Sequence, residues 1–314
     1  MRIDDFTLEN WLNPACDSEK NKYYLGGSCV LPMTVEELFD LTGESMENFF
    51  EELKHMNLGY PRFEGTPRTR KALSKLYKNV EPDEVILCHG GTGANATVCY
   101  ALIESTDNII SIMPNYQQFY SIPRSIGAEL REVDLKIKDG YKLDLSEVRA
   151  AADKNTKAIL FTNPNNPTTT VMRRESLEKL AQFAVKNDLI VVCDQAFEDS
   201  VYDGVEFVTL ASLPGMWERT VTVCSISKGM ALSGYRVAYI VADDHIMDVY
   251  YGSAVSVIGA TNTASQLGAI AALKDASFLE EYNRIFDRRR KIVYEIFNSI
   301  PGVSMAMPES TFLC

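Results

Sequence analysis

The chain has 314 residues, a length at which two domains are the expected organisation. Its formal net charge of −12 argues against nucleic acid or an anionic membrane as the main partner, because both would be repelled. Hydrophobic residues make up 46% of the chain, yet no apolar run approaches the ~18 residues of a membrane-spanning helix.

The amino terminus carries Asp4 and Asp5 where a signal peptide needs a basic start and an apolar core. Seven cysteines form no Cys-Xaa-Xaa-Cys pair, and several lie inside apolar runs. His55, His89 and His245 are far apart and make no metal-ligand pattern. We therefore expect a cytoplasmic protein with reduced, buried thiols and no metal site.

Short apolar runs alternate with helical patterns along the middle of the chain. The strands are expected at 84–88, 108–113, 158–162, 189–193, 220–224 and 237–241, and helices at 94–104 and 174–187. This alternation predicts a mostly parallel sheet covered by helices, with ligands at the carboxyl ends of the strands. An amphipathic segment at 35–56 precedes it. One long helix at 277–299 follows, and its basic run favours a solvated helix face.

A glycine-rich segment at 90–94 (Gly-Gly-Thr-Gly-Ala) follows the first strand and opens a helix. Glycines let backbone amides approach an anion, and a helix amino terminus adds positive potential. A phosphate site is therefore favoured over a simple tight turn. The spacing also fits a dinucleotide fingerprint, which would indicate a nicotinamide enzyme. No clear strand-ending acidic residue follows at the required ~20 residues, so that alternative lacks support.

The next three strands are also followed by candidate ligand-binding residues. Tyr116 follows the strand at 108–113, where its ring either stacks on a planar heterocycle or fills the core. After the strand at 158–162, a loop holds two Asn-Pro pairs, at 163–164 and at Asn166-Pro167, which favours a rigid loop that aims a side-chain amide over a simple turn. Asp194 ends a buried strand, where a carboxylate needs a cation unless it caps a helix.

The strand at 220–224 is followed by Ser225, Ser227 and Lys228, with Arg236 eight residues after the lysine. These residues offer an amine for a Schiff base, and two hydroxyls and a guanidinium for a phosphate. Taken alone, Ser-Xaa-Ser-Lys is equally compatible with a serine-rich loop and a solvated lysine. Its place after the upstream motifs favours a binding site for a phosphorylated aldehyde cofactor.

From about Tyr60 to the end, this motif set resembles the pyridoxal-phosphate enzymes of the aspartate aminotransferase superfamily, fold type I, class I/II. The resemblance implies an α/β fold with a mostly parallel central sheet covered by helices, and a smaller domain truncated at the carboxyl terminus. The implied domains are an arm and part of the small domain at 1–44, a large cofactor-binding domain at 45–275, and a linking helix with the start of the small domain at 276–314.

The resemblance also implies pyridoxal 5'-phosphate as the cofactor and a role for each candidate residue. Lys228 would form the Schiff base and serve as general base, and Asp194 would keep the pyridine nitrogen protonated. Asn166 would bind the ring oxygen, and Tyr116 would stack on the ring. The phosphate would be held by Ser225, Ser227, Arg236 and the amides of Gly91, Thr92 and Gly93. Tyr60 resembles a tyrosine that reaches the neighbouring subunit's phosphate, which implies a homodimer with shared sites.

The implied activity is transfer of an amino group between an amino acid and a 2-oxo acid. Three departures from the family pattern leave alternatives open. Phe197 stands in place of a tyrosine, Thr169 in place of a glycine, and the chain reaches Cys314 within the predicted first strand of the small domain, before the family's carboxylate-binding arginine. The alternatives are a pyridoxal-phosphate lyase or cyclising synthase, and a truncated cofactor-binding protein with little activity.

Overall fold

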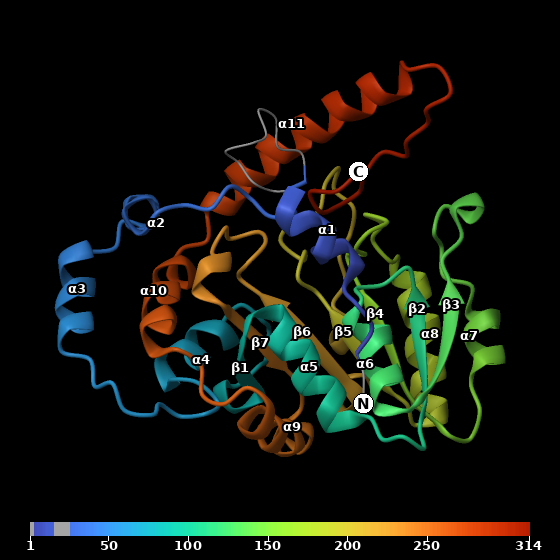
Figure 1. The fold of residues 1–314 in the computed structure, drawn as a ribbon, viewed down its shortest axis with the longest axis horizontal. Coiled ribbons are helices and arrows are strands. Elements are labelled where there is room, and N and C mark those ends of the chain that lie inside the picture. Colours follow the sequence, from blue (N-terminus) through green and yellow to red (C-terminus); the bar gives the residue numbers. More distant parts are fainter. Residues whose placement is uncertain (1–2, 16–25) are drawn as a thin grey trace.

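The computed structural model describes residues 3–15 and 26–314 of the chain. Its centre is a seven-stranded sheet in the order β1-β7-β6-β5-β4-β2-β3 (Figure 1). The strands are β1 (Val85–His89), β2 (Asn108–Met113), β3 (Glu129–Asp134), β4 (Thr156–Thr162), β5 (Ile190–Asp194), β6 (Thr220–Ser225) and β7 (Val237–Val241). The predicted strand-and-helix alternation is confirmed. Strand boundaries differ by at most two residues, whereas the helix predicted at 94–104 begins four residues earlier, at Gly90.

The sheet is mostly parallel, as expected, except at β7. Strands β3, β2, β4, β5 and β6 pair in parallel, whereas β7 is antiparallel to both β6 and β1. Since β7 runs in the opposite direction, it begins at the edge of the sheet where its neighbours end. That reversal brings Arg236, the residue before β7, to the carboxyl edge that carries the other candidates.

Helices cover both faces of the sheet because alternate strand residues point to opposite sides. In β1, Ile86 and Cys88 pack under one group of helices, whereas Val85 and Leu87 pack under another. The first face carries α5 (Gly90–Leu102), α6 (Gln118–Ile126) and α9 (Asp244–Val257). The second face carries α7 (Leu145–Ala151), α8 (Arg174–Asn187), α2 (Val35–Thr42), α4 (Pro67–Ser74) and α10 (Thr263–Lys274).

The amphipathic segment predicted at 35–56 forms two helices, α2 and α3 (Met46–Lys54). Thr34 begins α2 with a capping box, in which its side chain accepts from the Glu37 amide and the Glu37 carboxylate accepts from the Thr34 amide. Gly43 ends α2 in the left-handed conformation at φ 65°, which glycine adopts without steric cost. A further helix, α1 (Thr7–Ala15), lies near the amino terminus.

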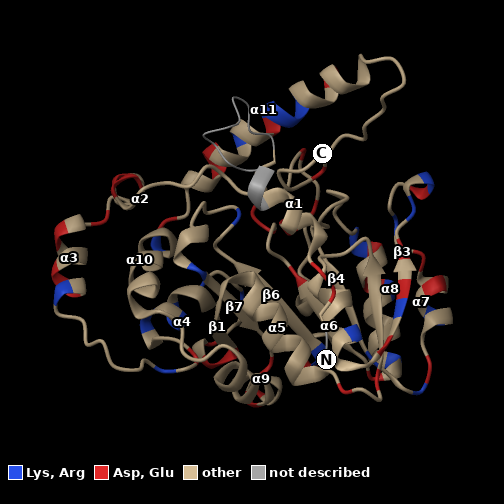
Figure 2. Cartoon of the chain, viewed as in Figure 1, with Lys and Arg blue, Asp and Glu red and all other residues tan. Residues whose placement is uncertain are grey.

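The edge strand β3 was not predicted from the sequence. Its residues, Glu-Leu-Arg-Glu-Val-Asp, are mostly charged, and among them only Val133 is buried. Figure 2 shows this charge at the edge of the sheet, whereas the interior strands β6 and β7 carry none. Charged residues on an edge strand discourage pairing with another chain, so this composition is typical of an edge strand. The same composition lacks the apolar pattern by which a strand is predicted from sequence.

The long helix predicted at 277–299 is α11 (Phe278–Asn298), which extends away from the sheet (Figure 1). The interpretation of its basic run as a solvated face is wrong for Arg290. That side chain is buried, pairs with Asp203 (2.6 Å) and Asp287, and donates to the Pro308 carbonyl. Desolvation is tolerated because two carboxylates and a carbonyl satisfy the guanidinium.

A strand was expected near residue 312, but the structure has none there. It has only an isolated β-bridge between Ser310 and Val201. The proposed division into domains remains a prediction. Cys88, Cys99, Cys193 and Cys224 are buried and unpaired, and Cys16 lies outside the described residues. In the described ranges, no helix is both long and apolar enough to cross a membrane.

Candidate active site

The glycine-rich segment forms the first turn of α5, which begins directly at Gly90. In the part of the chain that the structure describes, no side chain caps this helix, so the amides that follow Gly90 can face an anion. Gly90 has a left-handed φ of 69°, and its amide donates to the Arg236 carbonyl at 2.9 Å. The Arg236 guanidinium lies against the same turn. It donates to the Thr92 hydroxyl at 3.4 Å and to the Ser233 carbonyl at 3.1 Å, and is otherwise exposed.

Asp194 is the last residue of β5 and is buried, with 7% of its surface exposed. Its carboxylate accepts hydrogen bonds from the Asn95 amide of α5 (3.0 Å) and from the Ala196 backbone (2.9 Å). Burial raises the pKa of Asp194, whereas these two bonds and the positive charge of Lys228 oppose the rise. A cation bound beside Asp194 would complete the compensation of its charge.

The loop between β4 and α8 lies beside Asp194, since the Asn163 amide donates to the Asp194 carbonyl at 3.0 Å. Asn165 is buried and braces the loop through Thr162 and the Pro114 carbonyl. Asn166 is half-buried, and its backbone amide donates to the Thr162 hydroxyl. Thr169 has φ 63°, a left-handed conformation that explains why glycine suits this position in the resembled family.

Tyr116 lies in the turn after β2 and is half-buried. Its ring faces Phe6, which precedes α1, with 5.7 Å between the ring centroids. Burial raises the pKa of Tyr116 to about 12, the charges of Asp194 and Glu9 raise it too, and that of Arg236 lowers it. The tyrosine therefore lies within the electrostatic reach of both Asp194 and Arg236.

Lys228 follows β6 in a turn held by the two serines. The Ser225 hydroxyl donates to Ser227 Oγ at 2.8 Å and accepts from the Ser227 amide at 3.1 Å. The Lys228 amine donates to Ser28 Oγ at 3.2 Å and lies 5.9 Å from the centre of the buried Phe197 ring. Phe197 in turn packs edge-on against Phe312.

The structure therefore gathers most of the predicted residues at the carboxyl edge of the sheet. They are Gly91, Thr92, Gly93, Tyr116, Asn166, Asp194, Ser225, Ser227, Lys228 and Arg236. Tyr60 is the exception. It lies in the segment between α3 and α4, which runs round the outside of the molecule, and 94% of its side chain is exposed.

Two residues of the site were missed from the sequence. Asn95 is a buried polar residue among the small and apolar residues of α5, and that contrast is a signal for its contact with Asp194. Ser28 gives no such signal, because its contact with Lys228 joins residues 200 positions apart.

A buried polar cluster lies beside the strand ends that carry Asp194 and Lys228. The Glu198 carboxylate accepts from the Tyr77 hydroxyl (2.7 Å) and from the Gln195 amide (2.8 Å). Tyr77 also contacts Cys224 Sγ (2.9 Å) and the Tyr239 hydroxyl (3.1 Å). Burial raises the pKa of the Glu198 carboxyl to about 7, and the charge of Asp199 adds to the rise.

Replacing Glu198 with glutamine is expected to change the pH dependence of stability. Between about pH 4.5 and 7 the folded protein binds more protons at Glu198 than the unfolded chain, so stability falls as pH rises through this window. Glu198→Gln removes that loss. Its unfolding free energy relative to the parent should rise by roughly 2–3 kcal/mol between pH 5 and pH 8.5, measured by urea unfolding. Exposed Glu178→Gln is the control, and an equal pH response in both variants would contradict the assignment.

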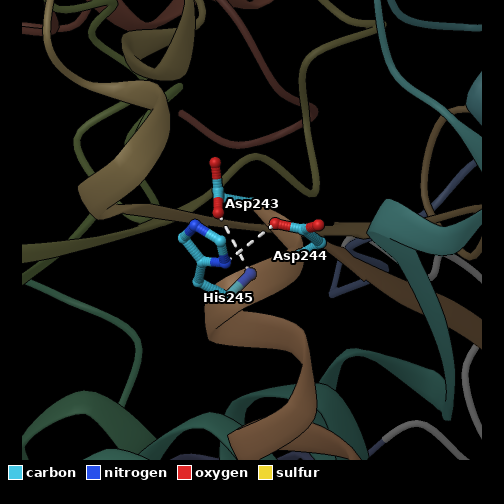
Figure 3. A group of neighbouring side chains, drawn as sticks. All are labelled: Asp243, Asp244 and His245. Atoms are coloured by element: carbon cyan, nitrogen blue, oxygen red, sulfur yellow. Dashed lines mark hydrogen bonds and ion pairs between the residues drawn. The ribbon is translucent and has the colours of Figure 1, made fainter.

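A second cluster, Asp243, Asp244 and His245, brings potential metal-binding atoms within 4.8 Å of one another at the start of α9 (Figure 3). Asp243 caps the helix by accepting from the His245 amide at 3.0 Å, and Asp244 pairs with the His245 ring at 3.2 Å. Helix capping accounts for this arrangement. We assign no metal site to it.

Comparison with known proteins identifies relatives over nearly the whole chain. The model of the family described as "Aminotransferase class I and II" matches residues 20–314. A probable aspartate/prephenate aminotransferase of Aquifex aeolicus is 29% identical over 87% of this chain and 72% of its own length. An aspartate aminotransferase of Pyrococcus abyssi is 30% identical over 79% of this chain and 66% of its own.

A solved structure is also closely similar. The crystal structure of a PLP-dependent aminotransferase from Streptococcus suis superposes with a TM-score of 0.91 at 30% identity. The superposition covers 98% of this chain and 81% of that one. The chain thus spans between about two thirds and four fifths of the length of these relatives.

Proposed function

The chain belongs to the class I and II aminotransferases, and from that premise we propose that it transfers an amino group between an amino acid and a 2-oxo acid. Pyridoxal 5'-phosphate is the cofactor of this proposal. The observation that carries it is the Lys228 amine, placed at the same sheet edge as the buried Asp194, whose charge it partly offsets.

The donors at this edge fit the cofactor's phosphate. The first turn of α5 offers uncapped amides, and a Cβ built on Gly91 would meet no atom within 4 Å, so there is open space beside them. Arg236 adds a full positive charge, and Ser225 and Ser227 add hydroxyls. A dianion held there would be neutralised locally, which the net charge of −12 requires.

The rest of the site fits the cofactor's ring. Asp194 would hold a positive charge on the ring nitrogen, because a buried carboxylate stabilises a cation beside it. Tyr116 would stack on the ring, and Asn166 would donate to its oxygen. When bound, the cofactor withdraws electrons from the substrate's α-carbon and makes its proton acidic. Lys228 would accept that proton as general base and later return it.

The test is to add pyridoxal 5'-phosphate to the purified chain and then supply amino acids with 2-oxoglutarate. The relatives' names make aspartate the first amino donor to try. We expect a yellow complex and formation of glutamate with the matching oxo acid. Release of ammonia without consumption of 2-oxoglutarate would instead indicate a lyase. A colourless protein that binds NADH would contradict the proposal.

Phe197 is expected to set the pH response of the bound cofactor. A tyrosine hydroxyl there would donate to the ring oxygen and favour its anionic form. In Phe197→Tyr, the midpoint of the absorbance titration of the loaded protein should therefore fall by about 1 pH unit, equivalent to about 1.4 kcal/mol. The variant's circular dichroism spectrum is the control for correct folding. An unmoved midpoint in a folded variant would show that residue 197 does not face the ring oxygen.

A homodimer with shared active sites, located in the cytoplasm, completes the proposal. Leu58 and Tyr60 support the dimer, because both side chains are more than 90% exposed on one extended segment. The buried, unpaired cysteines support a reducing compartment.

Sedimentation should give the mass of a dimer. A mixture of Tyr60→Ala and Lys228→Ala chains should regain part of the activity if Tyr60 acts in the neighbouring site, and no regain would place it elsewhere.

A further inference from the structure

The Lys228 amine has a hydrogen-bond partner from the opposite end of the chain. It donates to Ser28 Oγ at 3.2 Å, and both side chains are half-buried. Ser28 follows Gly26 and Gly27 in the segment that leads into α2. In the view of Figure 1, this segment passes above the sheet. The amine also lies over the face of the Phe197 ring, 5.9 Å from its centroid. Among the residues that the structure describes, Ser28 is therefore a polar group in direct contact with the reacting nitrogen.

A hydroxyl is suited to an amine that gains and loses a proton. It accepts a hydrogen bond from an ammonium group and donates one to a neutral amine, so it fits both states without a change of position. A carboxylate in the same place would fit the ammonium group alone, and an apolar side chain would fit neither. Serine also has a short side chain, which loses little rotamer freedom when it holds the lysine.

We propose that Ser28 is a further catalytic residue, whose hydroxyl holds the Lys228 amine in line with the substrate's α-carbon during proton transfer. This inference rests on the proposed function. The proton passes from the α-carbon to Lys228 Nζ. Ser28 neither gains nor loses a proton. Its hydroxyl donates a hydrogen bond to the free amine before the transfer and accepts one from the ammonium group afterwards.

A purely structural role makes a different prediction. If the contact only ties the segment at 26–34 to the rest of the protein, its loss would weaken stability and substrate binding without affecting the proton-transfer step. The two roles are separated by substrates deuterated at the α-carbon, since a poorly aligned base slows breakage of that bond selectively.

The variants are Ser28→Ala, which removes the hydroxyl, and Ser28→Thr, which keeps it. Cys29→Ala is the matched control, being the next residue and half-buried. In Ser28→Ala, kcat should fall by roughly 10- to 100-fold with KM changed less than about two-fold, and the deuterium isotope effect on kcat should rise. Ser28→Thr should recover most of kcat, and Cys29→Ala should match the parent.

A second readout needs no cofactor. In the cofactor-free protein, labelling of Lys228 by a small amine-reactive reagent, followed by peptide mass spectrometry, should be several-fold faster in Ser28→Ala, because the hydroxyl no longer holds and covers the amine. If Ser28→Ala labels like Cys29→Ala and keeps the parent's isotope effect, the inference fails while the proposed function stands. If the parent forms no oxo acid with bound pyridoxal 5'-phosphate, the proposed function fails and this inference with it.

Discussion

Replacing Lys228 with alanine is expected to lower the rate of amino transfer by at least about 10³-fold, because both the cofactor's attachment point and the general base are lost. The amine is half-buried at the carboxyl edge of the sheet, in contact with Ser28 and within the electrostatic reach of Asp194. Lys228 is the one lysine among the proposed site residues, so none of the others could take over its role. The measurement is single-turnover oxo-acid formation by protein loaded with pyridoxal 5'-phosphate.

Chemical rescue makes this test specific. A small amine added to Lys228→Ala should restore part of the rate, since it can enter the space of the lost side chain and accept the α-proton. Lys179→Ala is the control, because that lysine is exposed and pairs with Glu175 on α8. Near-normal turnover by Lys228→Ala would show that the lysine takes no part in the reaction.

Replacing Arg236 with alanine is expected to weaken binding of pyridoxal 5'-phosphate by roughly 2–4 kcal/mol, or about 30- to 1000-fold. Arg236 supplies a full positive charge to the proposed phosphate site. Its guanidinium contacts Thr92 and a backbone carbonyl, and no carboxylate within residues 3–15 and 26–314 pairs with it. Without it, the dianion would depend on amides and hydroxyls alone. Equilibrium dialysis gives the affinity directly, and an unchanged value would assign Arg236 a structural role.

Gly90 provides an independent check on the position of Arg236. A Cβ at residue 90 would lie 2.1 Å from Arg236 Nη2, and the φ of 69° already disfavours a side chain there. Gly90→Ala should therefore displace the guanidinium and weaken cofactor binding. In an Arg236→Ala background the same change should cost much less affinity. Additive losses would contradict a shared role in the phosphate site.

The central sheet was predictable because strands whose two faces are both covered by helices read as short continuous apolar runs. Runs such as 108–113 and 237–241 match β2 and β7 to the residue. The edge strand β3 lacks this signal, since its side chains are mostly charged. The break between α2 and α3 depends on the left-handed Gly43, which the apolar period alone does not reveal.

Site residues were predictable where they belong to local motifs at strand ends, as for Lys228 and Asp194. Contacts made by distant parts of the chain were not. Ser28 contacts Lys228 although the two are 200 positions apart. Arg290 belongs to the basic run of α11, yet it is buried in an ion pair with Asp203. Tyr60 is different again, because its role was assigned by resemblance and its exposed side chain makes that role depend on a second subunit.

The measurement that tests the central claim most directly is borohydride reduction of the protein loaded with pyridoxal 5'-phosphate, followed by peptide mass spectrometry. We predict that one phosphopyridoxyl group is fixed, on the peptide that contains Lys228. Ser28→Ala protein should carry the label on the same lysine, because Ser28 is not the attachment point. A label on another lysine, or no fixed label on a loaded protein, would contradict the assignment of this edge of the sheet as the active site.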